Sequence, residues 1–193
     1  IDVQKNERVK INEIIIKGND VLSEGKIKRT MKNTKQKAWW RFYKSSKFIE
    51  DDFEEDKESI ISTYNEEGFR DARIVKDSVI PHDENTINLV LKLEEGDKFF
   101  IRSIDWLGNT KYSNKELSRV LGIERGDVYN QKVLDEKLLY GPNSVFSLYQ
   151  DNGYLFSNIT PVEVNVEKDS IDFEMRIYEG KQARINRMKV TGN

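Results

Sequence analysis

One nine-residue phrase occurs three times in this chain, and it constrains the fold more than any other feature. The copies begin with Ile and end at Gly18-Asn19, Gly108-Asn109 and Gly192-Asn193. The second copy ends 90 residues after the first, and the third ends 84 residues after the second. A repeat of this length is typical of an array of similar modules. We therefore predict several copies of one structural unit in tandem.

Two further landmarks recur in the same order. A Tyr-x-x-x-Gly-aromatic segment at residues 64–69 returns 85 residues later, and a Glu-Gly pair at residues 95–96 returns 84 residues later. The first of these glycines is placed where a helix needs a left-handed cap. The predicted structural turns are Gly18, Asn19, Gly68, Gly96, Gly108, Asn109, Gly153 and Gly180.

These landmarks divide the chain into modules. We predict one complete module at residues 8–98 and a second at residues 99–182, each within the usual size range of a small domain. Residues 1–7 are expected to be the tail of a preceding module, and residues 183–193 the first strand of a truncated next one. The sequence is interpreted as a slice of a longer protein, and its function as that of a part.

Within each module the apolar pattern changes in a fixed order. The opening phrase is β-branched and alternating and ends in a turn, which predicts a strand. A short helix follows, because Ser113 with Glu116 three residues later is a capping box; Ser23 occupies the matching place in the first module. A second helix ends at Gly68, but Gly141-Pro142 interrupts it in the second module, so a broken helix is expected there.

Each module closes with two alternating segments joined by a turn. In the second module Val162, Val164 and Val166 alternate before the turn, and residues 171–177 alternate after it. Strict alternation predicts one buried and one solvated face for each strand. The order β-α-α-β-β thus predicts an α+β fold, in which each of two tandem modules is a three-stranded mixed sheet covered on one face by two helices.

The composition argues against most site chemistries. The chain has no cysteine, a net charge of −2 and a single histidine, His82, in a predicted turn. A thiolate metal site, a histidine cluster and a catalytic dyad therefore lack their partners. The acidic run at residues 50–58 lacks the spacing of a calcium loop, and the helix dipole explains acids near a helix start. No enzyme activity, cofactor, metal site or nucleic-acid binding is expected.

Three motifs in this order carry a family resemblance: Gly-Asn after the first strand, Tyr-x-x-x-Gly-aromatic after the second helix, and Glu-Gly after the last strand. Over essentially the whole chain they resemble the POTRA domain, above all in the periplasmic array of BamA-type outer-membrane protein assembly factors. Trp39-Trp40 resembles a Trp pair in the third of five such domains. The modules would then be the third and fourth, and residues 183–193 the first strand of the fifth. The resemblance also implies that the first strand and the first hairpin strand are the sheet edges.

The resemblance implies a periplasmic scaffold, attached to the outer membrane in the full-length protein, that binds clients for a β-barrel assembly factor. It would work by β-strand addition to unfolded outer-membrane proteins and by docking accessory lipoproteins. A C-terminal membrane barrel would follow in the full-length chain. The alternative is the POTRA array of a related translocation and assembly module, of a two-partner secretion transporter or of a division protein. An enzyme or nucleic-acid binder built on a similar sandwich is the third interpretation.

An edge strand presents unpaired backbone groups and can accept an extended peptide as an additional strand. The predicted edge of the first module has no internal proline and comprises Asp71, Ala72, Arg73, Ile74, Val75, Lys76, Asp77, Ser78, Val79 and Ile80. In the second module Pro161 removes one donor near the start of the matching strand. We hypothesise that the first module offers the better edge. The alternative is that both edges stay solvated or are covered by a neighbouring module.

A second candidate surface lies between the helices of the first module. It comprises Trp39, Trp40, Arg41, Phe42 and Tyr43 with flanking lysines, and no acidic residue occurs from Lys26 through Phe48. Interleaved bases and aromatics occur at sites for nucleic acid, anionic lipid or a protein partner. The favoured interpretation is that the aromatics pack over the helix pair and the lysines form a solvated rim. Contact with a membrane or a partner is the alternative.

Overall fold

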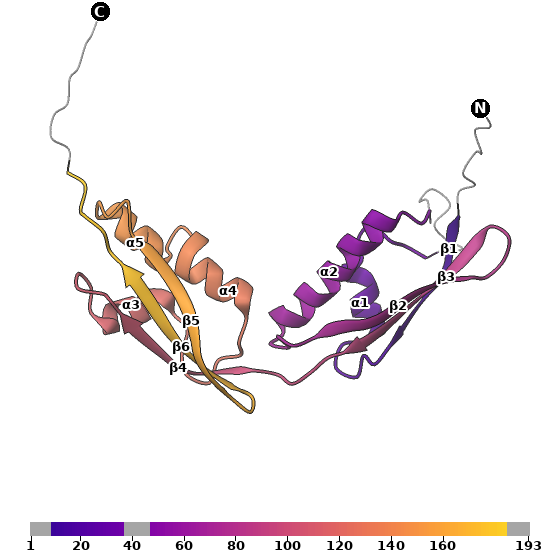
Figure 1. Ribbon diagram of the computed structural model, residues 1–193, viewed down its shortest axis with the longest axis horizontal. Coiled ribbons are helices and arrows are strands. Elements are labelled where there is room, and N and C mark those ends of the chain that lie inside the picture. The colour runs from indigo at the N-terminus through magenta and orange to yellow at the C-terminus, as the bar shows by residue number, and fades with distance from the viewer. Residues whose placement is uncertain (1–8, 37–46, 185–193) are drawn as a thin grey trace, which may run out of the picture. The chain divides into compact units, whose positions relative to one another are not determined.

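The computed structural model describes residues 9–36 and 47–184, in two compact units that divide between Asp97 and Lys98 (Figure 1). The first unit contains β1 (Lys10–Lys17), α1 (Glu24–Thr30), α2 (Glu50–Glu66), β2 (Arg73–Pro81) and β3 (Thr86–Glu94). The second contains β4 (Phe100–Leu107), α3 (Asn114–Leu121), α4 (Gln131–Asp135), the π-helical turn η1 (Glu136–Tyr140), α5 (Val145–Asp151), β5 (Asn158–Glu167) and β6 (Ser170–Tyr178). The predicted α+β class and element order are confirmed. The third copy of the repeated phrase lies outside the described residues.

Each module is built on one three-stranded mixed sheet. In the first, β3 lies between β1 and β2, parallel to β1 and antiparallel to β2; in the second, β6 lies between β4 and β5 in the same way. The helices of each module cover one face of its sheet (Figure 1). The uncovered surface, here termed the open face, holds alternate strand residues, and its centre is formed by Asn88, Val90 and Lys92 on β3 and by Asp172, Glu174 and Arg176 on β6.

The core of each module lies between the sheet and its helices. In the first module, alternate residues of β1 and β3 point toward the helices, which bury Ile14 and Ile16 together with Leu89 and Leu91. The helices contribute Ile27, Phe53, Ile60 and Tyr64 to the same cluster. Because burying one such side chain stabilises a fold by about 1.5–3 kcal/mol, this cluster supplies the main favourable contribution to the module.

The second helix of the second module is broken, as predicted. Helix α4 continues into η1, the chain turns at Gly141-Pro142, and the Ser144 hydroxyl caps α5 by accepting a hydrogen bond from the Ser147 N–H at 3.1 Å. The break leaves the apolar side intact, since Leu138 and Val145 on either side of it are both fully buried. Among the described helices, none is long and apolar enough to cross a bilayer.

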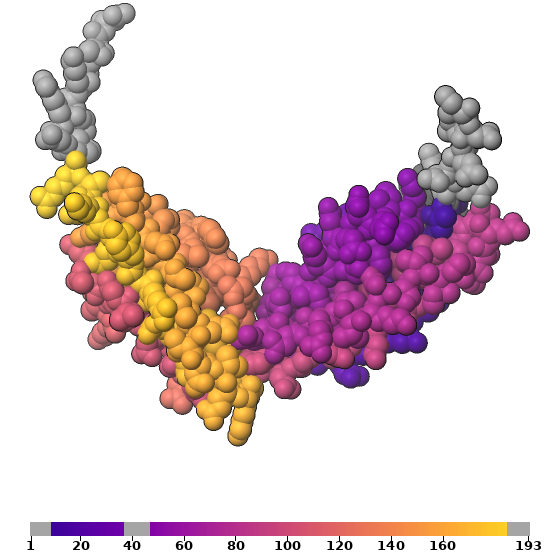
Figure 2. Space-filling model, in the orientation of Figure 1, coloured from indigo at the N-terminus to yellow at the C-terminus, as the bar shows by residue number. Residues whose placement is uncertain are grey.

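The alternation of Val162, Val164 and Val166 predicts that these valines form the buried face of β5, and this prediction is wrong. Val162 lies opposite Glu174 on the open face, and Val164 and Val166 are 51% and 45% exposed. A bulge between Glu163 and Asn165 adds one residue, which shifts the alternation along the strand. Figure 2 shows the end of the β5–β6 hairpin as a narrow projection from the body of its module. Alternation in the sequence therefore does not mark the buried side here.

Candidate functional site

The repeated landmarks meet in space at one end of each sheet. In the first module the buried carboxylate of Glu95, from the Glu-Gly pair, accepts hydrogen bonds from four donors. The donors are the backbone N–H groups of Asp20 (2.9 Å), Val21 (2.9 Å) and Leu22 (3.3 Å) and the hydroxyl of Tyr64 (2.7 Å). One carboxylate thus ties the turn after the Gly-Asn phrase to the second helix and to the end of the sheet.

The glycine of each Gly-Asn phrase is required by close packing of the backbone. Gly18 has a φ of +76°, and a Cβ there would lie 2.3 Å from the carbonyl oxygen of Leu93. Gly108 has a φ of +88°, and a Cβ would lie 2.2 Å from the oxygen of Ile177. A side chain at either position would collide with the last strand. The other predicted turn glycines with positive φ are Gly68, Gly96, Gly153 and Gly180.

The two asparagines that follow these glycines close the same turns. The side-chain amide of Asn19 donates to the Leu22 oxygen at 2.9 Å, and that of Asn109 donates to the Tyr112 oxygen at 2.9 Å. The second module also repeats the carboxylate contacts with Glu179. Its donors are the N–H groups of Thr110 (2.9 Å) and Lys111 (2.8 Å), the Thr110 hydroxyl and the Tyr149 hydroxyl (2.9 Å).

These junction glutamates, Glu95 and Glu179, are held in the charged form. Burial pushes the pKa of Glu95 upward, but the hydrogen bonds from Tyr64 and the backbone outweigh it, and the pKa lies below its ordinary value. The same balance lowers the pKa of Glu179. Burial, and then the carboxylate beside it, raises the pKa of the Tyr64 hydroxyl. The carboxylate of each junction glutamate is occupied by hydrogen bonds from backbone N–H and hydroxyl groups of its own module. The junctions are therefore structural elements, and these two carboxylates offer no free acid or base for catalysis.

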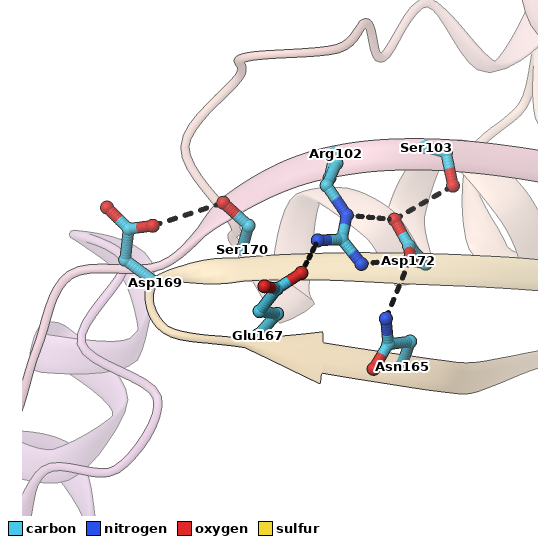
Figure 3. A network of polar contacts seen from close by, with 7 residues as sticks. All are labelled: Arg102, Ser103, Asn165, Glu167, Asp169, Ser170 and Asp172. Atoms are coloured by element: carbon cyan, nitrogen blue, oxygen red, sulfur yellow. Dashed lines mark hydrogen bonds and ion pairs between the residues drawn. The ribbon is translucent and has the colours of Figure 1, made fainter.

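A polar network that sequence reasoning missed lies on the open face of the second sheet (Figure 3). The guanidinium of Arg102 on β4 donates to both oxygens of Asp172 on β6, at 2.8 and 2.5 Å, and to Glu167 on β5 at 2.5 Å. Hydrogen bonding from Arg102 holds the pKa of the Asp172 carboxyl well below its usual range. All three strands are thereby joined, and the one guanidinium offsets part of the negative charge of the two carboxylates.

Asp56 and His82 are the remaining titratable candidates from the sequence. Asp56, within the acidic run, is buried and accepts hydrogen bonds from the backbone N–H groups of Lys32 (2.8 Å), Asn33 (3.1 Å) and Thr34. It therefore closes the loop after α1. His82 is exposed in the turn between β2 and β3. Across residues 9–36 and 47–184, no cluster of three or more potential ligands could hold a metal ion.

The first strand of each sheet has its outer edge partly closed. In the first module the Phe48 N–H donates to the Val9 oxygen at 2.9 Å, and the Gln36 side chain accepts from the Ile14 N–H at 3.2 Å. In the second, the Ile101 N–H donates to Asp127, the Gly126 N–H donates to Ile101, and the Tyr129 N–H donates to Phe99. Strands β1 and β4 are thus poor sites for strand addition.

Strand β2 is the open edge of the first sheet. Eight of the ten residues of the predicted edge, Arg73 through Ile80, lie in β2, whereas Asp71 and the buried Ala72 lie in the turn before it. Its backbone pairs with β3 on one side, and no described residue pairs with the other side. Bulging between Ile74 and Lys76 interrupts the register at Val75. Six residues from Lys76 to Pro81 then remain in continuous register with β3.

Strand β5 is the corresponding edge of the second sheet, and it is interrupted further from its ends. Pro161 lies inside the ten-residue strand, whereas Pro81 ends β2. A proline in a paired edge strand turns its nitrogen side to solvent, so Pro161 removes a donor from the outward side. The bulge between Glu163 and Asn165 follows two residues later. The longest uninterrupted outward edge is therefore on β2.

The second candidate surface is not placed by the structure. Trp39, Trp40, Arg41, Phe42 and Tyr43 all lie outside the described residues. Whether they pack over the helix pair or contact a partner stays a prediction.

Comparison with known families decides the class of module. A family model described as POTRA, surface antigen variable number repeat, matches residues 9–96 and again residues 99–180.

The chain belongs to the POTRA family.

Its two POTRA modules resemble parts of longer proteins. Over 196 residues the chain is 27% identical to the outer membrane protein assembly factor BamA of Neisseria meningitidis serogroup B, a match that covers 100% of this chain and 24% of that protein. It is 20% identical to BamA of Neorickettsia risticii, with 98% of this chain and 25% of that protein covered. The chain thus spans about a quarter of the length of these relatives.

Solved structures share the POTRA fold. The crystal structure of Haemophilus influenzae BamA POTRA3-5 superposes with a TM-score of 0.64 at 21% identity, covering 95% of this chain and 73% of that one. The structure of Haemophilus ducreyi BamA lacking POTRA domains 1-3 gives a TM-score of 0.59 at 14% identity, covering 88% of this chain and 29% of that one. At these identities the likeness concerns the fold.

Proposed function

We propose that this chain is a periplasmic, non-enzymatic part of an outer-membrane protein assembly factor, in which β2 receives extended segments of unfolded client proteins as an additional strand. Two kinds of observation support the proposal. The relatives that match nearly the whole chain carry the name of such an assembly factor. The first POTRA module also has one partly closed and one open sheet edge.

The open side of β2 is the observation that carries the proposal. Backbone N–H and C=O groups on a free edge can pair with almost any extended chain, because the main-chain groups that form the bonds are nearly the same in every sequence. That property suits a receptor whose clients share β-structure and differ in sequence. Strand β1 is less suited to strand addition, since the Gln36 side chain already accepts the hydrogen bond of the Ile14 N–H and Phe48 pairs with Val9.

Docking of accessory lipoproteins is the second part of the proposal, and it rests on the family resemblance alone. A related translocation module, a two-partner secretion transporter or a division protein remains the alternative setting for the same POTRA pair. Strand addition at β2 is expected in any of these settings, because it depends on the first sheet and not on what surrounds it.

Titration of the ¹⁵N-labelled two-module chain with an extended porin-like peptide tests the proposal. We expect chemical-shift changes or broadening for amides of residues 73–80, and weaker changes for residues 157–163, where Pro161 removes a donor. Pro161→Thr is a matched variant, since it restores one outward N–H and should strengthen the response of β5. A response of residues 157–163 in the wild type that equals or exceeds that of β2 contradicts the proposal.

A further inference from the structure

Three lysines form a row across the open face of the first sheet. Lys17 of β1 lies opposite Lys92 of β3, which lies opposite Lys76 of β2. All three are exposed, and within the described part of the chain none has an ion-pair partner. With strands about 4.8 Å apart, the row places three positive charges across about 10 Å. Like charges directly opposite one another destabilise strand pairing, so the row lowers the stability of the sheet that carries it.

The second POTRA module shows that the fold does not require this row. The matching residues are Leu107, Arg176 and Thr160, and Arg176 is paired with Glu174 at 2.6 Å. Basic residues predominate on the first open face, with Lys10, Lys17, Arg73, Lys76 and Lys92 against Glu13 and Glu94. Acidic residues predominate on the second, with Asp105, Glu167, Asp172 and Glu174 against Arg102 and Arg176.

The lysine row ends at the open edge of the sheet. A strand added to β2 would place one side chain opposite Lys76, as the fourth position of the row. Further along the same face it would meet Ser78 and then Ile80, which is 47% exposed. The helix side of β2 adds no competing charge, because Asp77 is paired with Lys57 of α2.

We propose that the first module selects the segments that it adds to β2 by charge: it favours an extended acidic segment with Asp or Glu facing Lys76 and an apolar side chain facing Ile80. This inference rests on the proposed strand addition and names its preferred client. The carboxylate would lie about 5 Å from Lys76 and about 10 Å from Lys92, so more than one lysine of the row contributes.

Protection of a free edge explains only part of the row. A lysine on an edge strand discourages pairing with a second copy of the same chain, and Lys76 alone meets that need. Lys92 lies on the central strand, and Lys17 lies on the far edge. Neither protects β2, whereas both raise the positive electrostatic potential at the position of an acidic side chain beside Lys76.

The test uses the ¹⁵N-labelled two-module chain and three ten-residue probe peptides of alternating Thr and Val. The peptides differ in one central residue, which is Glu, Gln or Lys. We expect the Glu peptide to shift the amides of β2 and to bind about tenfold more tightly than the Lys peptide, with Gln between them. The difference should shrink severalfold in 1 M salt, where the Debye length is about 3 Å.

Two variants distinguish the effect of the lysine row on peptide binding from the effect of the net charge of the chain. Lys76→Glu should reverse the order, so that the Lys peptide binds more tightly than the Glu peptide. Lys115→Gln removes a positive charge from α3 in the other module and should leave the order unchanged. Thermal unfolding of Lys76→Glu checks that it folds, and its melting temperature should stay the same or rise, because the contact with Lys92 becomes attractive.

The outcomes separate this inference from the function on which it rests. Equal binding of the three peptides at β2 overturns charge selection and leaves strand addition standing. No shift at β2 with any peptide overturns both. A shift of β2 amides by vesicles of anionic lipid, without discrimination among the peptides, assigns the row to a membrane surface and also overturns the inference.

Discussion

Replacing the first junction glutamate by its amide, Glu95→Gln, tests whether the repeated motifs hold the POTRA module together. The carboxylate of Glu95 faces four donors, three from the backbone and one from Tyr64. A glutamine keeps one acceptor oxygen and turns an NH₂ group toward the remaining donors, which it cannot satisfy. The substitution therefore removes about half of the hydrogen bonds without changing the size of the side chain.

The magnitude follows from the burial of the site. Hydrogen bonds to a charged group contribute about 1.5–3 kcal/mol each, so losing two of them at a buried position should lower the free energy of unfolding by about 3–6 kcal/mol. The matched variant Glu179→Gln removes similar bonds at a position that is only partly buried. Water can replace a lost partner there, and the expected loss is about 1–2 kcal/mol.

Urea unfolding followed by two-dimensional NMR measures both modules in one sample. Amide signals of β3 report the first module, and those of β6 report the second. With an m value of about 1–1.5 kcal/mol per M, Glu95→Gln should lower the midpoint of the first module by about 2–6 M and leave the second in place. A midpoint change of less than about 0.5 M, or equal effects of the two substitutions on their own modules, would refute the reasoning.

Three further predictions concern the same local devices. Because the folded pKa of each junction glutamate lies below its ordinary value of 4.5, its stabilising effect is complete at neutral pH and is lost as the pH falls through the folded pKa. Acid titration by circular dichroism should show this loss of stability. In Glu95→Gln the stability of the first module should depend less on pH in the same range. Gly18→Ala should destabilise the first module by about 3 kcal/mol or more in urea, whereas Gly25→Ala, in open space inside α1, should stabilise it by about 0.5–1 kcal/mol. Asp172→Asn should speed hydrogen exchange at the β5–β6 hairpin end, with β2 and β3 unaffected; unchanged exchange would show that the Arg102 network does not order this end.

Features that depend on neighbouring residues could be predicted from the sequence. The Ser113–Glu116 capping box forms as expected, with both hydrogen bonds present. The break at Gly141-Pro142 is local in the same sense, because a proline acts on the turn that precedes it. The fold class followed from the order of such local signals, repeated in two modules.

Features that join distant segments could not be predicted. The hydrogen bond from the Val21 N–H to Glu95 spans 74 residues, and no local pattern names that partner. A signal was present nonetheless, since the Tyr and Glu-Gly landmarks recur together at nearly constant spacing. The exposure of Val164 shows the opposite error, because a bulge changes the face of a strand without interrupting its alternation in sequence. The helix dipole alone does not explain Asp56, because its carboxylate binds a loop that only the tertiary fold brings near.

Residues that recur and residues that differ between the modules have separate physical roles. The fold requires a glycine where Gly18 and Gly108 approach the last strand, and it requires a carboxylate at the junction, so both modules keep them. The open face places no such demand, because Lys92 and the matching Arg176 both satisfy the same backbone pairing. A module could therefore change the charge of its edge and open face without changing its fold. The lysine row that ends on β2 is a difference of this kind, which is why binding specificity should be sought there and not in the repeated motifs.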